Sequence, residues 1–174
     1  MIVLMAGLPG TGKTTLAREL ARRTGGRVLS KDEIRHTLFS ADEIAYSTRQ
    51  DDFCLQVMLE TAGQLFQRDS QRIIFLDGRP FSRRYQVDNV VNAAASLHQD
   101  WRILECVCSE DVARERLAQQ SAAGAHPAGN RDFLLYLELR SRFEAITFLK
   151  TVVDTEKRLE DCVEVALREI LRST

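Results

Sequence analysis

The sequence predicts an α/β fold: a three-layer sandwich in which a five-stranded parallel sheet lies between helices, with a lid at one end. Five apolar segments alternate along the chain with helical patterns, and strands joined through helices run parallel in one sheet. The first apolar segment, residues 1–6, also passes directly into a glycine-rich loop and a helix. The chain has 174 residues, of which 44% are hydrophobic and 28% charged, so we expect a single domain over residues 1–174.

The glycine-rich loop reads GLPGTGKT over residues 7–14 and matches G-x-x-x-x-G-K-[ST], the phosphate-binding P-loop. Backbone N–H groups must wrap a triphosphate closely, and glycines allow this approach because they lack a Cβ atom. Lys13 supplies a positive charge for the β- and γ-phosphates, and the Thr14 hydroxyl is the expected inner ligand of Mg²⁺. The motif therefore predicts a site for ATP and Mg²⁺, with ATP contacts from Leu8, Pro9, Gly10, Thr11, Gly12, Lys13, Thr14 and Thr15.

Asp32 follows the second predicted strand. Residues 24–26, Thr-Gly-Gly, indicate the end of the first helix, and residues 27–30 form a short apolar strand that ends at Ser30. Asp32 then lies at the start of a helix, and Arg35 follows at i+3 on the same face. The carboxyl ends of parallel strands form the binding crevice, so Asp32 could face the γ-phosphate as a general base. Alternatively, Ser30 or Asp32 merely caps the helix.

The middle of the chain predicts a long helix within residues 41–70, behind a mobile segment at 41–52. Its apolar positions are Phe53, Val57, Leu59, Leu65 and Phe66. Residues 72–78 form the third strand, a continuous apolar run that is typical of a central parallel strand. That run ends in Asp77, which we expect to hold a water on Mg²⁺ or to position the acceptor, unless it only forms the turn before Gly78.

Three arginines follow the third strand: Arg79, Arg83 and Arg84. Because they lie at the edge of the expected crevice, they could hold an anionic substrate, and Arg79 is our candidate for that contact. The alternative is a solvated helix face, which we favour for Arg84.

The second half of the chain continues the alternation. A helix is predicted within residues 82–99, with an apolar stripe at Val87, Val90, Val91 and Ala94, and a fourth strand at 101–109. The next helix begins after Ser109 as N-cap and carries Arg114 and Arg116. Small and polar residues then predict a lid over about 118–132, with Arg131 at its far end. A disordered surface loop is the alternative.

Two helices and a strand complete the expected fold. Residues 133–146 predict a strongly amphipathic helix that returns from the lid, and residues 148–155 a fifth strand. Residues 158–173 predict a closing helix. The buried side of that helix is expected to carry Leu159, Cys162, Val163, Ala166, Leu167 and Ile170.

The charge, hydropathy and cysteine spacing of the sequence argue against several classes of protein. The net charge of -1 lacks the basic excess that is usual in proteins that hold long nucleic acids. The N-terminal apolar stretch is too short for a secretion signal and no run reaches membrane-spanning length, so we expect a cytoplasmic protein without membrane contact. The four cysteines lack zinc-site spacing and are interpreted as reduced packing residues, with Cys106 and Cys108 on one face of a strand.

These motifs together resemble the P-loop kinases, specifically the AAA-type predicted-kinase group, which includes the kinase domains of polynucleotide 5'-kinases and is related to gluconate kinases and zeta toxins. The resemblance covers nearly the whole chain. It rests on GLPGTGKTT, LSKDEIRHTLF, IIFLDG, ECVCSEDVARERL and the stretch from HPAGNRDFLLYLELRSRFEAI to VVDT. It implies the P-loop NTPase fold of the nucleoside-kinase-like type.

The resemblance also implies roles for individual residues. Asp32 corresponds to the general base on an acceptor hydroxyl, and Arg35 to an arginine that contacts the acceptor or its phosphate. Arg116 falls at the first lid-arginine position, which neutralises the transferring phosphate. A second lid arginine, frequent in the nucleic-acid kinases of the family, is replaced by Gln120, and Arg131 is the substitute candidate. Asp77 matches the family aspartate after the third strand, and Thr155 resembles an adenine-side contact.

The leading hypothesis is therefore an ATP-dependent kinase that transfers the γ-phosphoryl group to a hydroxyl of a small molecule, with Lys13, Asp32, Arg116 and Arg131 as catalytic residues. A polynucleotide 5'-hydroxyl kinase is the alternative acceptor assignment. An ATPase switch or motor is a different class; such proteins usually follow the apolar strand with Asp-Glu, whereas here Asp77 precedes glycine. A nucleotide-sensing module would leave Asp32 and the lid arginines without a role.

Overall fold

A computed structural model describes residues 1–122 and 132–172. Its centre is a five-stranded sheet in the order β2-β3-β1-β4-β5, and each neighbouring pair is parallel. The strands are β1 (Ile2–Ala6), β2 (Arg27–Ser30), β3 (Ile74–Asp77), β4 (Trp101–Val107) and β5 (Thr151–Asp154). The predicted number of strands, their order along the chain and their parallel direction are confirmed.

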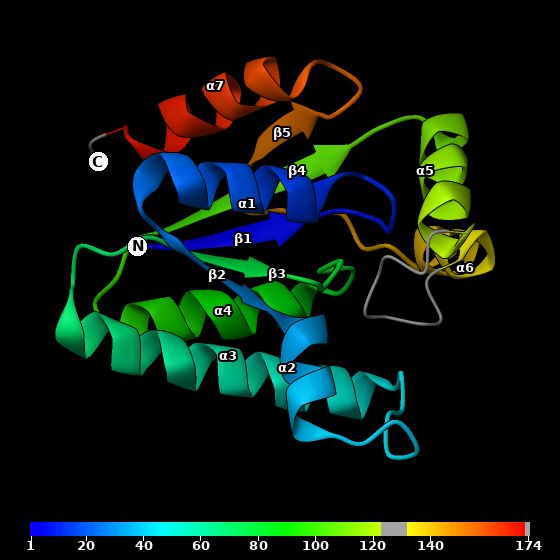
Figure 1. The fold of residues 1–174 in the computed structure, drawn as a ribbon. Coiled ribbons are helices and arrows are strands. Elements are labelled where there is room, and N and C mark those ends of the chain that lie inside the picture. The colour runs from blue at the N-terminus through cyan, green and yellow to red at the C-terminus, as the bar shows by residue number, and fades with distance from the viewer. Residues whose placement is uncertain (123–131, 173–174) are drawn as a thin grey trace.

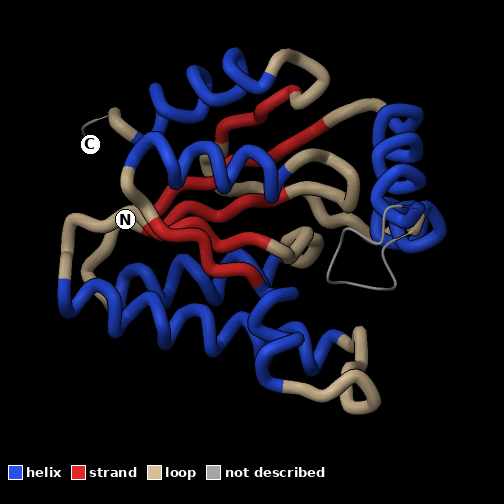
Figure 2. Tube along the Cα trace, in the orientation of Figure 1, coloured by secondary structure: helices blue, strands red, loops and turns tan. Residues whose placement is uncertain are grey.

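Helices connect the strands. They are α1 (Lys13–Thr24), α2 (Lys31–Leu38), α3 (Thr48–Arg68), α4 (Arg84–Ser96), α5 (Glu110–Ala122), α6 (Phe133–Ser141) and α7 (Leu159–Ile170). Helices α1 and α7 cover one face of the sheet, and α3 and α4 cover the other (Figure 1). Helices α5 and α6 lie apart from both layers, beyond the carboxyl ends of the strands (Figure 2).

The sheet separates two apolar cores because side chains alternate between its faces along each strand. On β1, Ile2 and Leu4 face the core formed with α3 and α4, whereas Val3 and Met5 face the core formed with α1 and α7. All four side chains are fully buried, which is the property expected of a central parallel strand. The continuous apolar run at the start of the sequence thus supplies both cores at once.

The sheet order places the candidate residues at one edge. Strands β1 and β3 are neighbours, and Asp77 at the end of β3 is in register with Ser30 at the end of β2. The loop after β1 and the start of α2 therefore meet at the carboxyl edge of the sheet. None of the described helices combines the length and apolar character that a membrane crossing requires.

Several expected details are wrong. Helix α3 begins at Thr48, inside the segment predicted to be mobile, and Phe53 is on its exposed side. Helix α6 ends at Ser141, and Tyr136 is its only buried residue; Leu134 is 74% exposed. Leu134 projects from a short helix outside the two main layers, so it has no sheet to cover.

Other differences are smaller. Leu159 begins α7 and is exposed. Strand β4 ends at Val107, so Cys108 lies in the following loop and does not share a strand face with Cys106. The four cysteines are free thiols, as predicted, and Cys108 alone among them is half-buried. Most of the predicted lid, including Arg131, lies outside the described residues.

Candidate functional site

The P-loop has backbone conformations that require glycine at two positions. Gly7 has a φ of 127°, and a Cβ atom added there would lie 2.3 Å from the carbonyl oxygen of Cys106 on β4. Gly10 has a φ of 81°, and its added Cβ would lie 2.9 Å from the carbonyl oxygen of Ala113 on α5. Both glycines allow the loop to pack directly against neighbouring backbone, which a side chain would prevent.

The loop also presents groups that suit an anion. Helix α1 begins after Gly12 without any side-chain cap, so its first N–H groups point into the loop unsatisfied by a side chain. The amine of Lys13 is buried and donates to the carbonyl oxygens of Gly7 and Leu8, both 2.7 Å away. A helix N-terminus and a buried ammonium group within one loop form an environment that favours phosphate.

Arg116 and Thr155 brace the outer side of the P-loop. The Thr155 hydroxyl lies 3.0 Å from the carbonyl oxygen of Thr11, to which it donates. Arg116 donates to the carbonyl oxygen of Thr155 at 2.7 Å and to its hydroxyl at 3.1 Å. The loop after β5 and helix α5 are thereby tied to the P-loop through side chains rather than through apolar packing alone.

A cavity of about 250 Å³ opens beside the P-loop at the carboxyl edge of the sheet. It is lined by the P-loop, both ends of the α2–α3 connection, the loop from β3 into α4, and α6. The lining residues are Pro9, Lys13, Thr14, Lys31, Asp32, Arg35, Tyr46, Thr48, Asp51, Gly78, Arg79, Pro80, Ser82, Arg83, Tyr85, Gln86, Leu135, Leu139 and Arg142. The candidate base and the P-loop lysine therefore line one cavity.

Asp32 is held by cations rather than used as a helix cap. Ser30 caps α2, since its hydroxyl accepts from the N–H of Glu33. Asp32, only 6% exposed, pairs through Oδ1 with Arg35 at 3.1 Å and with Lys31 at 3.3 Å. The alternative that Asp32 merely caps the helix is thus wrong.

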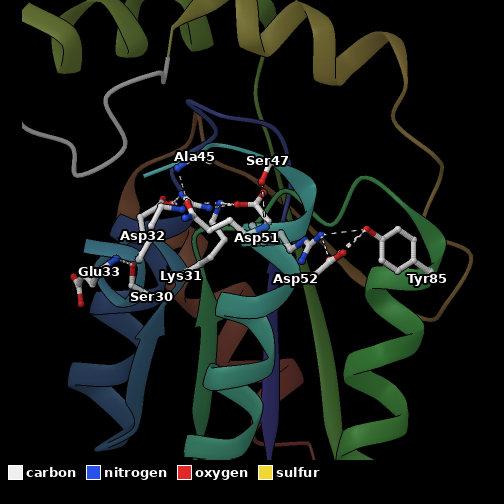
Figure 3. Close-up of polar contacts among 12 residues, drawn as sticks. Ser30, Lys31, Asp32, Glu33, Ala45, Ser47, Asp51, Asp52 and Tyr85 are labelled. Carbon is white, nitrogen blue, oxygen red and sulfur yellow. Dashed lines mark hydrogen bonds and ion pairs between the residues drawn. The ribbon is translucent and has the colours of Figure 1, made fainter. Parts of the chain in front are cut away.

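Asp51, at the start of α3, completes this group of charges. It accepts from Lys31 at 2.8 Å and from Arg35, so it shares both cations with Asp32 (Figure 3). Two carboxylates and two cations alternate here, which fixes the Asp32 side chain at the cavity wall. Asp51 reaches the site because α3 begins at Thr48, earlier than predicted.

Arg79 forms a second group of charges with Asp52, the residue after Asp51 on α3. Its Nη2 donates to Asp52 at 2.6 Å, and the Tyr85 hydroxyl on α4 lies 3.3 Å from the same carboxylate (Figure 3). Arg79 is 2% exposed, yet its Nε and Nη1 have no hydrogen-bond partner among residues 1–122 and 132–172. The neighbouring acids Asp51 and Asp52 thus hold different cations.

Asp77 is buried at the end of β3, and its Oδ1 lacks a partner in the part of the chain that the structure describes. Thr14, in the P-loop, lines the cavity, whereas Asp77 is not among the lining residues. An unpaired carboxylate oxygen and a threonine hydroxyl are oxygen donors of the kind that Mg²⁺ takes when phosphates and waters supply its other ligands. Within the described ranges, no three His, Cys, Asp or Glu side chains form a metal-binding group by themselves.

The structure brings some of the predicted site residues together at the cavity, but not all. Lys13, Thr14, Asp32, Arg35 and Arg79 line the cavity with Pro9. Arg116 and Thr155 lie behind the P-loop, outside the cavity lining.

Sequence reasoning missed further lining residues from α3, α4 and α6. Among them are Tyr46, Asp51, Gln86, Leu139 and Arg142. The basic residue beside Asp32, Lys31, was visible in the motif and could have been found there.

Comparison with known proteins identifies the family of this chain. The family described as "AAA domain" matches residues 2–145. This chain belongs to that AAA domain family. A search of curated proteins found no match.

Solved structures share the fold of this AAA domain over nearly its whole length. A Chloroflexus aurantiacus protein regarded as a kinase is 24% identical, with a TM-score of 0.75 and 98% of each chain covered. The Mycobacterium tuberculosis APS kinase in complex with AMPPNP and APS is 16% identical, with a TM-score of 0.73 and coverage of 98% of this chain and 97% of the other. A gluconokinase from Sinorhizobium meliloti is 17% identical, with a TM-score of 0.69 and coverage of 98% and 91%. The AAA domain therefore has the P-loop kinase fold, as the sequence predicts.

Proposed function

We propose that this AAA domain is an ATP-dependent kinase that phosphorylates a hydroxyl group of a small molecule. The observation that supports the proposal most directly is the shared cavity, because Asp32 lines the same 250 Å³ space as Lys13 and Thr14. A general base must reach the proton that it removes, and a kinase must keep water away from the transferring group. A cavity of this size suits a small acceptor better than a polymer.

In the proposed reaction, one carboxylate oxygen of Asp32 takes the proton from the acceptor hydroxyl. The acceptor oxygen forms a bond to the γ-phosphorus while the bond from that phosphorus to the β–γ bridging oxygen breaks, and ADP leaves with the electron pair. In the described part of the chain Arg35 and Lys31 both contact Oδ1 of Asp32, so Oδ2 is left to accept the proton. The two cations would fix the carboxylate and leave one of its oxygens for the substrate.

Positive charge would come from the P-loop. Lys13 would release the carbonyl oxygens of Gly7 and Leu8 and contact the β- and γ-phosphates instead. Thr14 and, through a water, Asp77 would hold Mg²⁺, which neutralises phosphate charge when bound. Arg116, tied to Thr155, would keep the P-loop in position, with Arg131 as the proposed lid arginine.

Structures of similar proteins support the proposed use of ATP by analogy. One neighbour was solved with AMPPNP and APS, and another, Kti12 of Chaetomium thermophilum, with ADP-AlF3. Kti12 is 14% identical to this chain, with a TM-score of 0.74 and coverage of 98% of this chain and 97% of the other. We propose that this chain binds ATP in the same way.

The test is a transfer screen with ATP labelled at the γ-phosphate. Sugars, nucleosides and other small alcohols are presented beside an oligonucleotide with a 5'-hydroxyl end, with and without Mg²⁺. We expect Mg²⁺-dependent labelling of a small alcohol by the wild-type protein, and none by Lys13→Ala.

Labelling of the oligonucleotide alone would replace the small-molecule assignment with the polynucleotide one. Phosphate release that no alcohol stimulates, but that a protein partner does, would favour the ATPase class and overturn the proposal.

A further inference from the structure

The cavity beside the P-loop has a strong excess of positive charge. Among its described lining residues, six side chains are cationic, and only Asp32 and Asp51 are acidic. Lys13 belongs to the P-loop, and Lys31 and Arg35 are shared between the two acids. The remaining cations, Arg79, Arg83 and Arg142, pair with acids that do not line the cavity, namely Asp52, Glu144 and Glu138.

Arg79 is the most informative of these cations. A guanidinium group has five N–H donors, and the three on Nε and Nη1 of Arg79 have no acceptor within the described ranges. Because the side chain is 2% exposed, water does not readily compensate for the missing acceptors. Asp52 contacts only Nη2, so the carboxylate orients the guanidinium without using its other donors.

Neighbouring side chains hold this arginine in a fixed orientation beside the cavity. The Tyr85 hydroxyl and Asp52 fix one edge of the guanidinium, and the Gln86 side chain is held by the backbone N–H of Arg83. Arg142 reaches the same cavity from the end of α6. Arg79 and Arg142 both line the cavity, and guanidinium groups suit an oxyanion, whose several oxygens can accept from more than one N–H group.

We propose that the acceptor carries an anionic group in addition to its hydroxyl, and that Arg79 and Arg142 bind this group while Asp32 faces the hydroxyl. The inference rests on the proposed kinase function, which requires Asp32 and the P-loop to line one cavity. Phosphate, sulfate and carboxylate groups are all oxyanions that such arginines can bind. The acceptor class is then a small phosphorylated, sulfated or carboxylated alcohol, and neutral sugars and nucleosides are poor substrates.

The experiment measures binding by calorimetry to protein saturated with AMPPNP and Mg²⁺, so that the P-loop is already filled. The probes are matched pairs, ribose 5-phosphate against ribose and gluconate against glucose, together with inorganic sulfate. We expect sulfate to bind, and the anionic member of at least one pair to bind more than 10-fold more tightly than its neutral partner. The two pairs distinguish a phosphate from a carboxylate ligand.

Variants assign the effect to the arginines. Arg79→Gln is expected to weaken anion binding at least 10-fold. Because Arg79 is buried, Arg142→Gln serves as the second variant; its side chain is 45% exposed, so folding should be preserved, and it should weaken the same probes several-fold. Arg84→Gln is the matched control, since that side chain is 73% exposed and lies outside the cavity lining.

The outcomes separate the inference from the proposed function. Absence of sulfate and anion binding, equal binding of neutral and anionic partners, or unchanged binding in both Arg79→Gln and Arg142→Gln would overturn the inference. Efficient phosphorylation of neutral alcohols would also overturn it and leave the kinase function standing. Tight anion binding without any phosphoryl transfer from ATP to the bound probes would support the anion site and argue against the kinase function.

Discussion

Arg35 donates from Nη1 to Oδ1 of Asp32, which lies 3.1 Å away and one helical turn earlier on α2. The arginine is 1% exposed and also binds Asp51, so it joins the start of α2 to the start of α3. The candidate base is thus part of an ion network between two helices, and its position depends on how those helices pack. The position of the proposed base and the packing of the two helices therefore depend on the same side chains.

The first prediction concerns Asp32→Asn. The amide cannot act as a general base, so we expect the rate of phosphoryl transfer to fall by about 10²–10⁴-fold. AMPPNP affinity should change little, because the P-loop contacts are untouched. Single-turnover transfer and calorimetry measure the two properties. Asp88→Asn on α4 is the control, since Asp88 pairs only with the exposed Arg84 and does not line the cavity; a transfer rate in Asp32→Asn equal to that of this control would exclude Asp32 as the base.

The second prediction compares two glycines with positive φ. In Gly7→Ala the new Cβ lies 2.3 Å from the carbonyl oxygen of Cys106, so the P-loop must move. We expect a loss of about 4 kcal/mol in the free energy of unfolding, from backbone strain and overpacking together. In Gly25→Ala the Cβ meets nothing within 4 Å, and the left-handed conformation alone should cost about 1–2 kcal/mol. Urea denaturation distinguishes them, and equal losses would show that the close approach to β4 does not matter.

The fold was predictable because the strongest sequence signals are also the ones that determine it. The apolar run of β1, the P-loop after it and the Gly25 helix end are local features, and each appears where the sequence places it. The helix predicted at 133–146 is present as α6, but it ends at Ser141 and lacks the expected buried face, for a physical reason. Its leucines suggested a buried face, but α6 lies beyond the edge of the sheet, and no apolar layer covers Leu134.

The candidate site was predictable only where one motif contains it. Lys13, Thr14, Asp32 and Arg35 belong to two short segments with a recognisable pattern. Asp51, Gln86 and Arg142 come from three separate elements, and only the packing of α3, α4 and α6 at the edge of the sheet brings them to the cavity. A single sequence does not specify that packing, since charged residues at helix ends are usually solvated.

The third prediction concerns thiol reactivity. Burial raises the pKa of the Cys106 thiol to about 12, and burial also raises the pKa values of Cys54, Cys108 and Cys162. All four should therefore react slowly with Ellman's reagent at pH 8, and half-buried Cys108 should react first. Urea should expose all four. Mass spectrometry of partially modified protein identifies the site, and first modification of Cys106 would contradict its burial beneath the P-loop.

The raised thiol pKa values also set a pH dependence. A group whose pKa is higher in the folded than in the unfolded protein stabilises the fold fully below its unfolded pKa, and this contribution is lost as the pH rises above it. For Cys106 the relevant range begins near pH 9 and ends near pH 12. We expect Cys106→Ala to reduce the loss of stability between pH 8 and pH 10, as measured by urea denaturation. An unchanged slope would show that this thiol does not contribute.

The fourth prediction concerns the brace behind the P-loop. Thr155→Val keeps the shape of the side chain but removes its hydroxyl, which donates to Thr11 and accepts from Arg116. We expect the protein to lose about 1–2 kcal/mol of stability, since buried partners are left unsatisfied. AMPPNP affinity should fall several-fold, because the P-loop is less well ordered before binding. Thr155→Ser should restore both properties by returning the hydroxyl. If Thr155→Val binds AMPPNP as the wild type does, the Thr155 hydroxyl is not needed for nucleotide binding.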